Sequence, residues 1–269
     1  MEARFPVLLC VAVLAFAGVS CVKNVRKERR IASGTLANPP SAQNAGAPLS
    51  YRSLPVQGPF IAMTFDDGPA AQNTPRLLDM LTARGIKATF FTVGQNAQRY
   101  PQIIRRIVAD GHELANHTWT HPWLSKMRDE AVRSELQRSR DALVSISGAE
   151  PRMYRPPYGA ITARQKEWIM NEFGYPTIFW SVDCGDSRTK NPAAIRSRIL
   201  TDTCPGAIIL VHDLHSWSVD AMPGTLDGLM AKGFRFVTMS QLMAMSSGRK
   251  QDGEREMASS SPRFSPGSF

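Results

Sequence analysis

Short apolar runs alternate with longer amphipathic segments through the middle of this chain. Runs rich in β-branched and aromatic residues that end at Gly, Pro or Asp are typical of buried strands. They predict strands at residues 60–65, 88–93, 112–116, 152–155, 176–182, 206–212 and 234–237. Segments of helical periodicity predict helices at residues 74–84, 96–109, 128–147, 161–173, 191–203, 217–231 and 238–245. Alternating strands and helices form parallel sheets, so we predict an α/β fold, an incomplete (β/α)7-type barrel of about seven parallel strands.

The pattern changes at both ends of the chain. Pro6–Val22 is a run of 17 uncharged, mostly apolar residues flanked by basic ones, which predicts a signal or anchor segment over residues 1–22. Cleavage, lipidation at Cys21 and retention as an anchor all fit this segment. Residues 23–57 are rich in small residues and Pro and predict a flexible tether. One domain is expected over residues 58–246, followed by a disordered tail at 247–269.

Composition narrows the classes of partner. The net charge is +9, but residues 1–50 alone hold six basic and two acidic residues. The body is therefore only mildly basic, and we expect no nucleic-acid partner. Two cysteines lie in the body, Cys184 after one predicted strand and Cys204 before the next. In a barrel of parallel strands these positions lie at opposite ends of the strands, separated by a strand length of about 17 Å. A disulfide needs its two Cα atoms within about 7 Å, so we expect none.

Two adjacent carboxylates end the first predicted strand, in Thr64-Phe-Asp-Asp-Gly-Pro69. Successive strand residues point to opposite faces. Asp66 and Asp67 can therefore take different roles, one toward a metal and one toward a proton. A plain turn is the alternative interpretation of this sextet.

Histidines are concentrated in two short segments of the chain. In His117-Thr-Trp-Thr-His121, two imidazoles four residues apart are expected on one face of a helical turn. With one aspartate they form a set of two histidines and one carboxylate, which suits zinc and is also the set of iron(II) oxygenases. His112 is expected to be structural. Trp119 is expected either to line the groove or to pack in the core, and His215 either to line the groove or to make a contact at its rim.

Three further motifs contain charged residues or a histidine. Arg155-Pro-Pro-Tyr-Gly159 places a cation on a proline-held loop, and Asp183-Cys-Gly-Asp186 and Leu210-Val-His212 each end an apolar run. All the motifs lie at predicted strand ends. In barrels of parallel strands the chemistry is found at the carboxyl ends of the strands, so motif and architecture agree.

Taken together, these five motifs resemble those of the NodB-homology polysaccharide deacetylases, carbohydrate esterase family 4. The resemblance covers residues 58–246 and implies a metal-dependent hydrolase that removes N-acetyl groups from an amino-sugar polymer. One position departs from the family pattern, because Ser187 stands where a Trp usually follows the second Asp of the fourth motif. That departure bears on substrate preference.

The resemblance also implies roles for individual residues. Asp67, His117 and His121 would bind the metal, most often Zn²⁺, with Co²⁺, Ni²⁺ or Fe²⁺ as alternatives. Asp66 would be the general base, held ionised by Arg155. The backbone N–H of Tyr158 would stabilise the oxyanion. His212, oriented by Asp186, would protonate the leaving amine. Leu210 and Trp217 would hold the acetyl methyl group.

The implied substrate is a glycan, peptidoglycan first and chitin-type oligosaccharides next. Such a polymer lies outside the cytoplasm, so we expect a monomer exported to the bacterial cell envelope, associated with the membrane through its N-terminal segment. A relative that binds glycans without hydrolysing them is the remaining alternative. Intact Asp66, Arg155, Asp186 and His212 speak against it.

Overall fold

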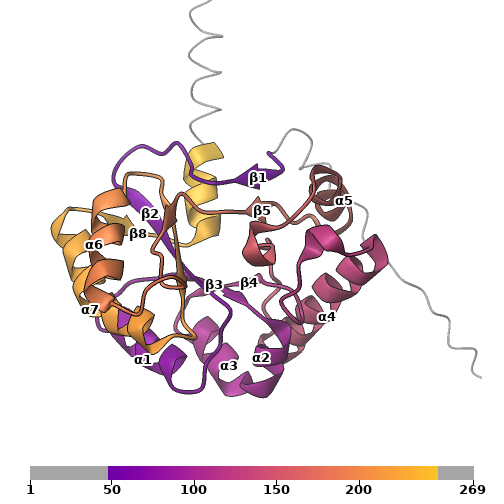
Figure 1. Cartoon of the computed structure of the whole chain (residues 1–269), viewed down its shortest axis with the longest axis horizontal. Coiled ribbons are helices and arrows are strands. Elements are labelled where there is room, and N and C mark those ends of the chain that lie inside the picture. The colour runs from indigo at the N-terminus through magenta and orange to yellow at the C-terminus, as the bar shows by residue number, and fades with distance from the viewer. Residues whose placement is uncertain (1–47, 248–269) are drawn as a thin grey trace, which may run out of the picture. The chain divides into compact units, whose positions relative to one another are not determined.

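Parallel strands flanked by helices make up the part of the chain that this computed structural model describes, residues 48–247 (Figure 1). The predicted segment at 1–22, the first part of the predicted tether and residues 248–269 lie outside the described residues. Within residues 48–247, no helix combines the length and the apolar character needed to cross a membrane.

The elements follow the predicted alternation. The strands are β1 (Ser50–Tyr51), β2 (Phe60–Asp66), β3 (Thr89–Thr92), β4 (Glu113–Asn116), β5 (Thr177–Ile178), β6 (Val182–Asp183), β7 (Ile208–His212) and β8 (Arg235–Phe236). The helices are α1 (Asn73–Thr82), α2 (Gly94–Arg99), α3 (Pro101–Ala109), α4 (Asp129–Ser147), α5 (Ala163–Phe173), α6 (Pro192–Asp202) and α7 (Ser216–Ala231), with a closing helix over residues 239–247. Two short 3-10 helices are η2 (Leu124–Lys126) and η3 (Pro157–Gly159).

The strands pair in parallel in the order β4-β3-β2-β7-β6, with β8 added to the start of β2. A second sheet pairs β1 with β5. Tyr154 links the two sheets, because it bridges to Asn116 at the end of β4 and to Thr177 in β5. The prediction of an α/β fold with an incomplete barrel of parallel strands is confirmed.

The alternation of side chains along β2 and β7 determines what faces the inside. Ile61, Met63 and Phe65 belong to the core between the strands and the outer helices. The residues between them point the other way, so Thr64 and Asp66 face the inside of the strand layer. The same rule places Leu210 and His212 of β7 on the inner side, since Ile209 and Val211 belong to the outer core. β2 and β7 pair in register, Asp66 with His212.

Three predicted elements differ from the observed ones. The strand predicted at 152–155 is reduced to the bridge at Tyr154, between Pro151 and Pro156, which lack the N–H that a ladder needs. The helix predicted at 96–109 is two helices, because Pro101 begins a new one after Tyr100. The run predicted at 176–182 is two short strands, β5 and β6.

The start of the domain also differs from the prediction. Residues 48–57 of the predicted tether belong to the fold, because β1 pairs with β5 and Leu54 is buried in the inner core. The N–H of Leu54 donates to the carbonyl of Gly206 over 3.0 Å. Small residues and prolines in this stretch concealed a short strand.

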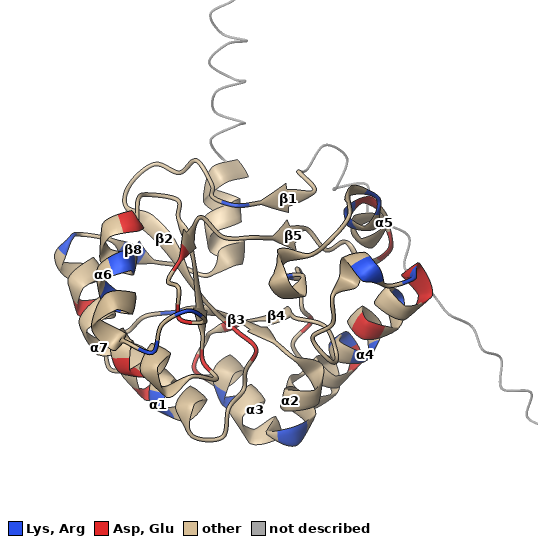
Figure 2. Cartoon of the chain, viewed as in Figure 1, with Lys and Arg blue, Asp and Glu red and all other residues tan. Residues whose placement is uncertain are grey.

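Acidic and basic residues are interspersed over the outer helices (Figure 2). Several form ion pairs between neighbouring helices, such as Arg76 of α1 with Asp220 of α7 at 2.7 Å. Exposed pairs of this kind contribute little to stability, about 0–1 kcal/mol each. The ionisable residues with chemical consequence are the buried ones inside the strand layer.

Candidate active site

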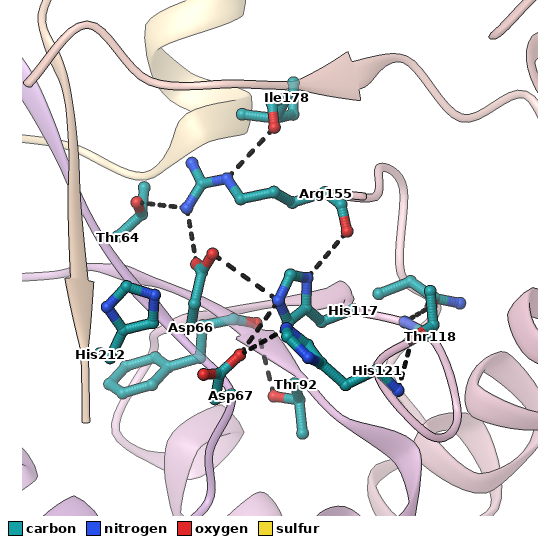
Figure 3. Close-up of polar contacts among 12 residues, drawn as sticks. Thr64, Asp66, Asp67, Thr92, His117, Thr118, His121, Arg155, Ile178 and His212 are labelled. Atoms are coloured by element: carbon teal, nitrogen blue, oxygen red, sulfur yellow. Dashed lines mark hydrogen bonds and ion pairs between the residues drawn. The ribbon is translucent and has the colours of Figure 1, made fainter. Parts of the chain in front are cut away.

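Side chains from the ends of β2, β4 and β7 and from the loop after Tyr154 meet on the inner side of the strand layer (Figure 3). Asp66 is the last residue of β2 and is only 2% exposed. Asp67 follows with a positive φ of 74°. This turn in the backbone ends the strand, so the two neighbouring carboxylates reach the site from different directions.

Asp67, His117 and His121 form a compact set of three metal-ligating side chains. Asp67 Oδ1 lies 3.1 Å from Nε2 of His117 and 3.1 Å from Nε2 of His121. The three atoms are within 4.8 Å of one another. Asp67 Oδ1 is buried and has no hydrogen-bond partner among the described residues. Such an orphaned carboxylate oxygen facing two imidazole nitrogens fits a cation ligand.

The tautomer of His117 supports the same conclusion. Its Nδ1 lies 2.8 Å from the carbonyl oxygen of Arg155. A carbonyl can only accept, so Nδ1 carries a proton, and in the neutral ring Nε2 presents a lone pair. Nε2 is the nitrogen that faces Asp67 Oδ1, at 3.1 Å. A hydrogen bond from the far nitrogen is the usual way to orient a metal-binding histidine.

The two histidines are not on a helical turn, contrary to the prediction. They lie in the loop after β4, where Thr118 and His121 have positive φ angles of 68° and 63°. The side-chain oxygen of Asn116 accepts the N–H of Thr118 over 2.8 Å, and the hydroxyl of Thr118 accepts the N–H of His121 over 3.0 Å. These bonds stabilise an uncommon backbone conformation, and that conformation brings both rings to one point.

Arg155 is fully buried and holds Asp66. Its Nη1 donates to Asp66 Oδ1 over 2.6 Å and to the hydroxyl of Thr64 over 2.8 Å. Nε and Nη2 donate to the carbonyls of Ile178 and Phe179 over 3.1 and 3.2 Å. Burial lowers the pKa of Arg155 and the charge of Asp66 raises it, but a guanidinium stays protonated in proteins.

The geometry leaves one oxygen of Asp66 available. Oδ1 is occupied by Arg155, while Oδ2 points toward the metal-ligating set, 3.8 Å from Nε2 of His117. Asp66 is therefore arranged to accept a proton at Oδ2 from a group bound at the three ligands.

His212 and Asp186 form a separate pair on the other side of Asp66. His212 Nδ1 lies 2.7 Å from Asp186 Oδ1, and the N–H of His212 and the hydroxyl of Ser218 each donate to Asp186 Oδ2 over 2.8 Å. Burial favours the neutral ring, but the hydrogen bond and the charge of Asp186 outweigh it and raise the pKa of His212 to about 9. The ring is therefore protonated at neutral pH.

Comparison with known proteins agrees with this geometry. A sequence model described as polysaccharide deacetylase matches residues 54–178. A peptidoglycan-N-acetylglucosamine deacetylase of Bacillus cereus is 37% identical over 201 residues, which cover 72% of this chain and 73% of that protein. The chain belongs to the polysaccharide deacetylase family. This membership confirms the resemblance and the hydrolase class, and it overturns the iron(II) oxygenase alternative.

Other relatives within the family carry different names. A chitooligosaccharide deacetylase of Sinorhizobium fredii is 41% identical over 170 residues, which cover 61% of this chain and 79% of that protein. A peptidoglycan-N-acetylglucosamine deacetylase of Listeria monocytogenes is 36% identical over 182 residues, and the match spans only 38% of that longer protein.

Among solved structures, a peptidoglycan N-acetylglucosamine deacetylase in complex with 4-naphthalen-1-yl-N-hydroxybenzamide has 34% sequence identity and a TM-score of 0.70. This match covers 75% of the present chain and 95% of that chain. The deacetylase fold therefore accounts for nearly all of the described residues.

The remaining predicted residues surround this centre. Tyr158 is 55% exposed, with a φ of 60°, and its ring contacts His121 at a centroid distance of 4.7 Å. Leu210 is buried in β7, two residues before His212 and on the same side of the strand. Trp217 is half-buried, and its Nε1 donates to the carbonyl of Asp186 over 2.9 Å. Ser187 is exposed in the turn that follows Asp186.

Other predictions concern residues near the site. His215 stacks on Trp217 at 4.5 Å and so lies at the rim, whereas Trp119 is buried and packs against Gly94. His112 is buried away from the site; its Nδ1 accepts the N–H of Ala88 over 3.2 Å, and burial lowers its pKa to about 4. The prediction that His112 is structural is confirmed.

The cysteine prediction is confirmed as well. Cys184 is buried and Cys204 is exposed, and both are free thiols. Burial raises the pKa of the Cys184 thiol far above its usual range. The charge of the neighbouring Asp186 carboxylate also raises the pKa of this thiol.

Three contributors were missed by sequence reasoning. Thr64 accepts from Arg155, and its place two residues before Asp66 in the same strand was the available signal. Ser218 donates to Asp186 and had no signal in the sequence. Asp213 is fully buried behind the turn at Gly68, where it accepts a hydrogen bond from the hydroxyl of Thr74, and burial raises its pKa to about 7.

Proposed function

We propose that this protein is a metal-dependent N-deacetylase of an amino-sugar polymer, with peptidoglycan as the preferred substrate. The observation that carries the proposal is the adjacency of three elements within one site. These are a compact two-histidine, one-carboxylate set, an aspartate fixed by a buried arginine, and a protonated histidine on the opposite side. Hydrolysis of an unactivated amide needs a polarised carbonyl, a base and an acid, and each has a candidate here.

The ligand set favours zinc. Two imidazole nitrogens and one carboxylate oxygen are borderline donors that suit Zn²⁺, and Co²⁺, Ni²⁺ or Fe²⁺ can occupy the same set. When bound at Asp67, His117 and His121, such an ion would supply Lewis acidity that polarises the acetyl carbonyl and lowers the pKa of water. The related deacetylase crystallised with an N-hydroxybenzamide supports a metal, since hydroxamates chelate metal ions.

Asp66 takes the proton of the attacking water in this proposal. Its Oδ1 is held by Arg155 at 2.6 Å, so only Oδ2 is free to accept. The four hydrogen bonds of Arg155 to Asp66, Thr64, Ile178 and Phe179 keep the guanidinium from moving. The base is therefore oriented before the substrate binds.

Tyr158 supplies the oxyanion donor through its backbone. Its positive φ places residue 158 in a conformation that few side chains adopt. Within residues 48–247 its N–H donates no hydrogen bond, while the next two N–H groups donate to Pro156 and Pro157. A strained residue with a free N–H beside a metal-ligating set suits an oxyanion donor.

His212 delivers a proton to the leaving amine. Its Nδ1–H is fixed by Asp186, so the proton for transfer is on Nε2. A pKa of about 9 keeps the ring protonated at neutral pH, and the leaving amine is itself basic enough to accept that proton. Leu210 and Trp217 line this side and would accommodate the acetyl methyl group.

Location and assembly follow from the same proposal. Peptidoglycan lies outside the cytoplasmic membrane, so residues 1–22 would direct export or anchor the chain in the envelope, and the residues before β1 would give the domain its reach. The catalytic groups all come from one chain, so a monomer suffices.

A chitin-type substrate is the second candidate, because a chitooligosaccharide deacetylase is among the relatives. Acetate release separates the candidates. We expect the full-length protein to release acetate from peptidoglycan, more slowly from chitin oligomers and least from acetylated xylan. A chelator should abolish release and added Zn²⁺ should restore it. Acetate from xylan alone, or release that withstands the chelator, would contradict the proposal, and no release from any glycan would favour a non-catalytic relative.

A further inference from the structure

Three large exposed apolar side chains lie in the loops around the candidate active site. Within residues 48–247 the large exposed apolar residues are Trp123, Tyr158, Leu214, Met230 and Met245. The first three lie in loops that follow strand ends on the side of the metal-ligating set. Exposed aromatic surface in one place is a mark of ligand binding, and Trp123 has no role in the chemistry described above.

Trp123 is stacked on Tyr158. The ring centroids are 4.4 Å apart and the planes are inclined by only 13°. Trp123 is nevertheless 47% exposed and Tyr158 is 55% exposed. The ring of Tyr158 in turn touches His121. The two rings therefore form a continuous aromatic platform that begins at a metal ligand and extends outward.

The backbone beneath Trp123 is anchored, although its side chain is exposed. Leu124 is fully buried, and its carbonyl accepts from Nε2 of Gln165 over 2.9 Å. The N–H of Ser125 donates to the carbonyl of Ala160 over 3.2 Å. Rigid presentation of an exposed ring lowers the entropic cost of binding a ligand on it.

A cation accompanies the platform. The Nζ of Lys126 lies 4.8 Å from the centre of the Trp123 ring. Lys126 is exposed and forms no ion pair among the described residues. The exposed surface of the two stacked rings, with an ammonium over one of them, offers apolar contact to the C–H groups of a pyranose and charge pairing to an anionic substituent.

We propose that Trp123, Tyr158 and Lys126 form a subsite for the sugar next to the one that is deacetylated, and that Lys126 pairs with a carboxylate carried by the substituent of that sugar. This proposal rests on the proposed function, since it assumes a glycan in the site. It narrows the substrate to a chain of at least two sugars with acidic substituents, as peptide-bearing wall strands have.

Substrate length provides the test. The Trp123→Ala variant should lower kcat/KM on the disaccharide N,N′-diacetylchitobiose roughly tenfold through KM, with less than about a threefold change on the monosaccharide N-acetylglucosamine, as loss of one aromatic contact implies. Trp123→Phe should restore most of the loss. Met230→Ala, which removes an exposed side chain on α7, is the matched control. Equal losses on both lengths would overturn the subsite, because they would show that Trp123 acts only through Tyr158.

The charge of Lys126 provides a second test. Lys126→Gln should lower kcat/KM on peptide-bearing glycan fragments about threefold to tenfold at low salt and less at high salt, with no change on N-acetylchitotetraose. Lys232→Gln, at the end of α7, is the control. An equal loss on the uncharged oligomer, or no loss on the peptide-bearing one, would contradict the role of Lys126.

Binding separates this proposal from the proposed function. If the wild-type chain releases no acetate from any glycan, the function fails while the subsite is still measurable by calorimetry with N-acetylchitotetraose. Weaker binding by Trp123→Ala than by Met230→Ala would then support the subsite. Equal binding by the two variants would overturn it.

Discussion

Two pairings of aspartate with histidine face each other across Asp66, and they have opposite hydrogen bonding. In the first, Asp67 Oδ1 lies 3.1 Å from His117 Nε2, and the Nδ1 proton of that ring is directed away from Asp67, to the carbonyl of Arg155. In the second, the ring of His212 directs its Nδ1 proton to Asp186 over 2.7 Å. The residue types are the same, but the first pairing is open to a cation and the second is already complete.

The surroundings of the two carboxylates explain the difference. Asp186 also accepts the N–H of His212 and the hydroxyl of Ser218, so its charge is satisfied by protein donors. Asp67 Oδ1 is buried and accepts no hydrogen bond from the residues that the structure describes. A buried carboxylate oxygen is costly unless something positive or protic meets it. The comparison teaches that the hydrogen-bond partners around each Asp and His, rather than the two residues themselves, distinguish a pair that can bind a cation from a pair that can donate a proton.

The largest effect should follow from His117→Ala. Two remaining ligands hold a divalent cation poorly, so the variant should lose its metal and all measurable turnover. Elemental analysis of the purified protein measures this directly. His215→Ala, which removes a ring from the acid side, should keep the metal. Stoichiometric metal in His117→Ala would show that the first pairing is not a metal site.

A smaller effect is expected from Asp186→Asn. In the proposed mechanism His212 acts in its protonated form, so activity is expected below its pKa and should be lost as pH rises through it. The wild-type profile of kcat/KM should therefore fall on its alkaline side near pH 9, and the variant should fall closer to the ordinary histidine value of 6.5. At neutral pH we expect roughly a tenfold to hundredfold loss.

Asp183→Asn is the matched control for that profile. Asp183 lies three residues earlier and pairs with Arg188 at the surface over 3.0 Å. The kcat/KM profile of the Asp183→Asn variant should fall at the same alkaline pH as that of the wild type. A limb that moves equally in both variants would remove the specific link between Asp186 and His212.

The smallest effect is expected at Ser187, which is exposed in the turn after Asp186. A tryptophan there would add an aromatic side chain next to the pair formed by Asp186 and His212. Ser187→Trp should shift the ratio of rates toward linear chitin oligomers and away from branched peptidoglycan, by a few-fold, with metal content unchanged. An unaltered ratio would remove Ser187 from the account of specificity.

The sequence allowed much of this arrangement to be predicted, because strand alternation and strand ends are local properties. The run that ends in Asp66 and Asp67 and the run that ends in His212 were both predicted from apolar periodicity. The segment of His117 and His121 was wrongly predicted as a helical turn. It is a loop in which Thr118 has a positive φ, and the N–H of Thr118 donates a hydrogen bond to the side chain of Asn116. Spacing alone does not reveal such a bond.

Contacts to backbone carbonyls were beyond sequence reasoning for a different reason. The carbonyl of Arg155 orients His117, and every residue has a carbonyl, so no residue type marks it. Trp123 was missed because an aromatic residue in a predicted loop gives no sign of its exposure. The short strand β1 was missed because its two residues are too few for periodicity to show.

The measurement that tests the central claim most directly is metal content together with turnover in Asp66→Asn and Asp67→Asn. Asparagine at 66 still accepts the hydrogen bond of Arg155, so the fold should survive, the metal should stay, and turnover should fall by about 10²–10⁴. Asparagine at 67 replaces a charged ligand with a neutral amide, so the metal should be lost. Metal lost from Asp66→Asn and kept by Asp67→Asn would contradict the division of roles at the end of β2.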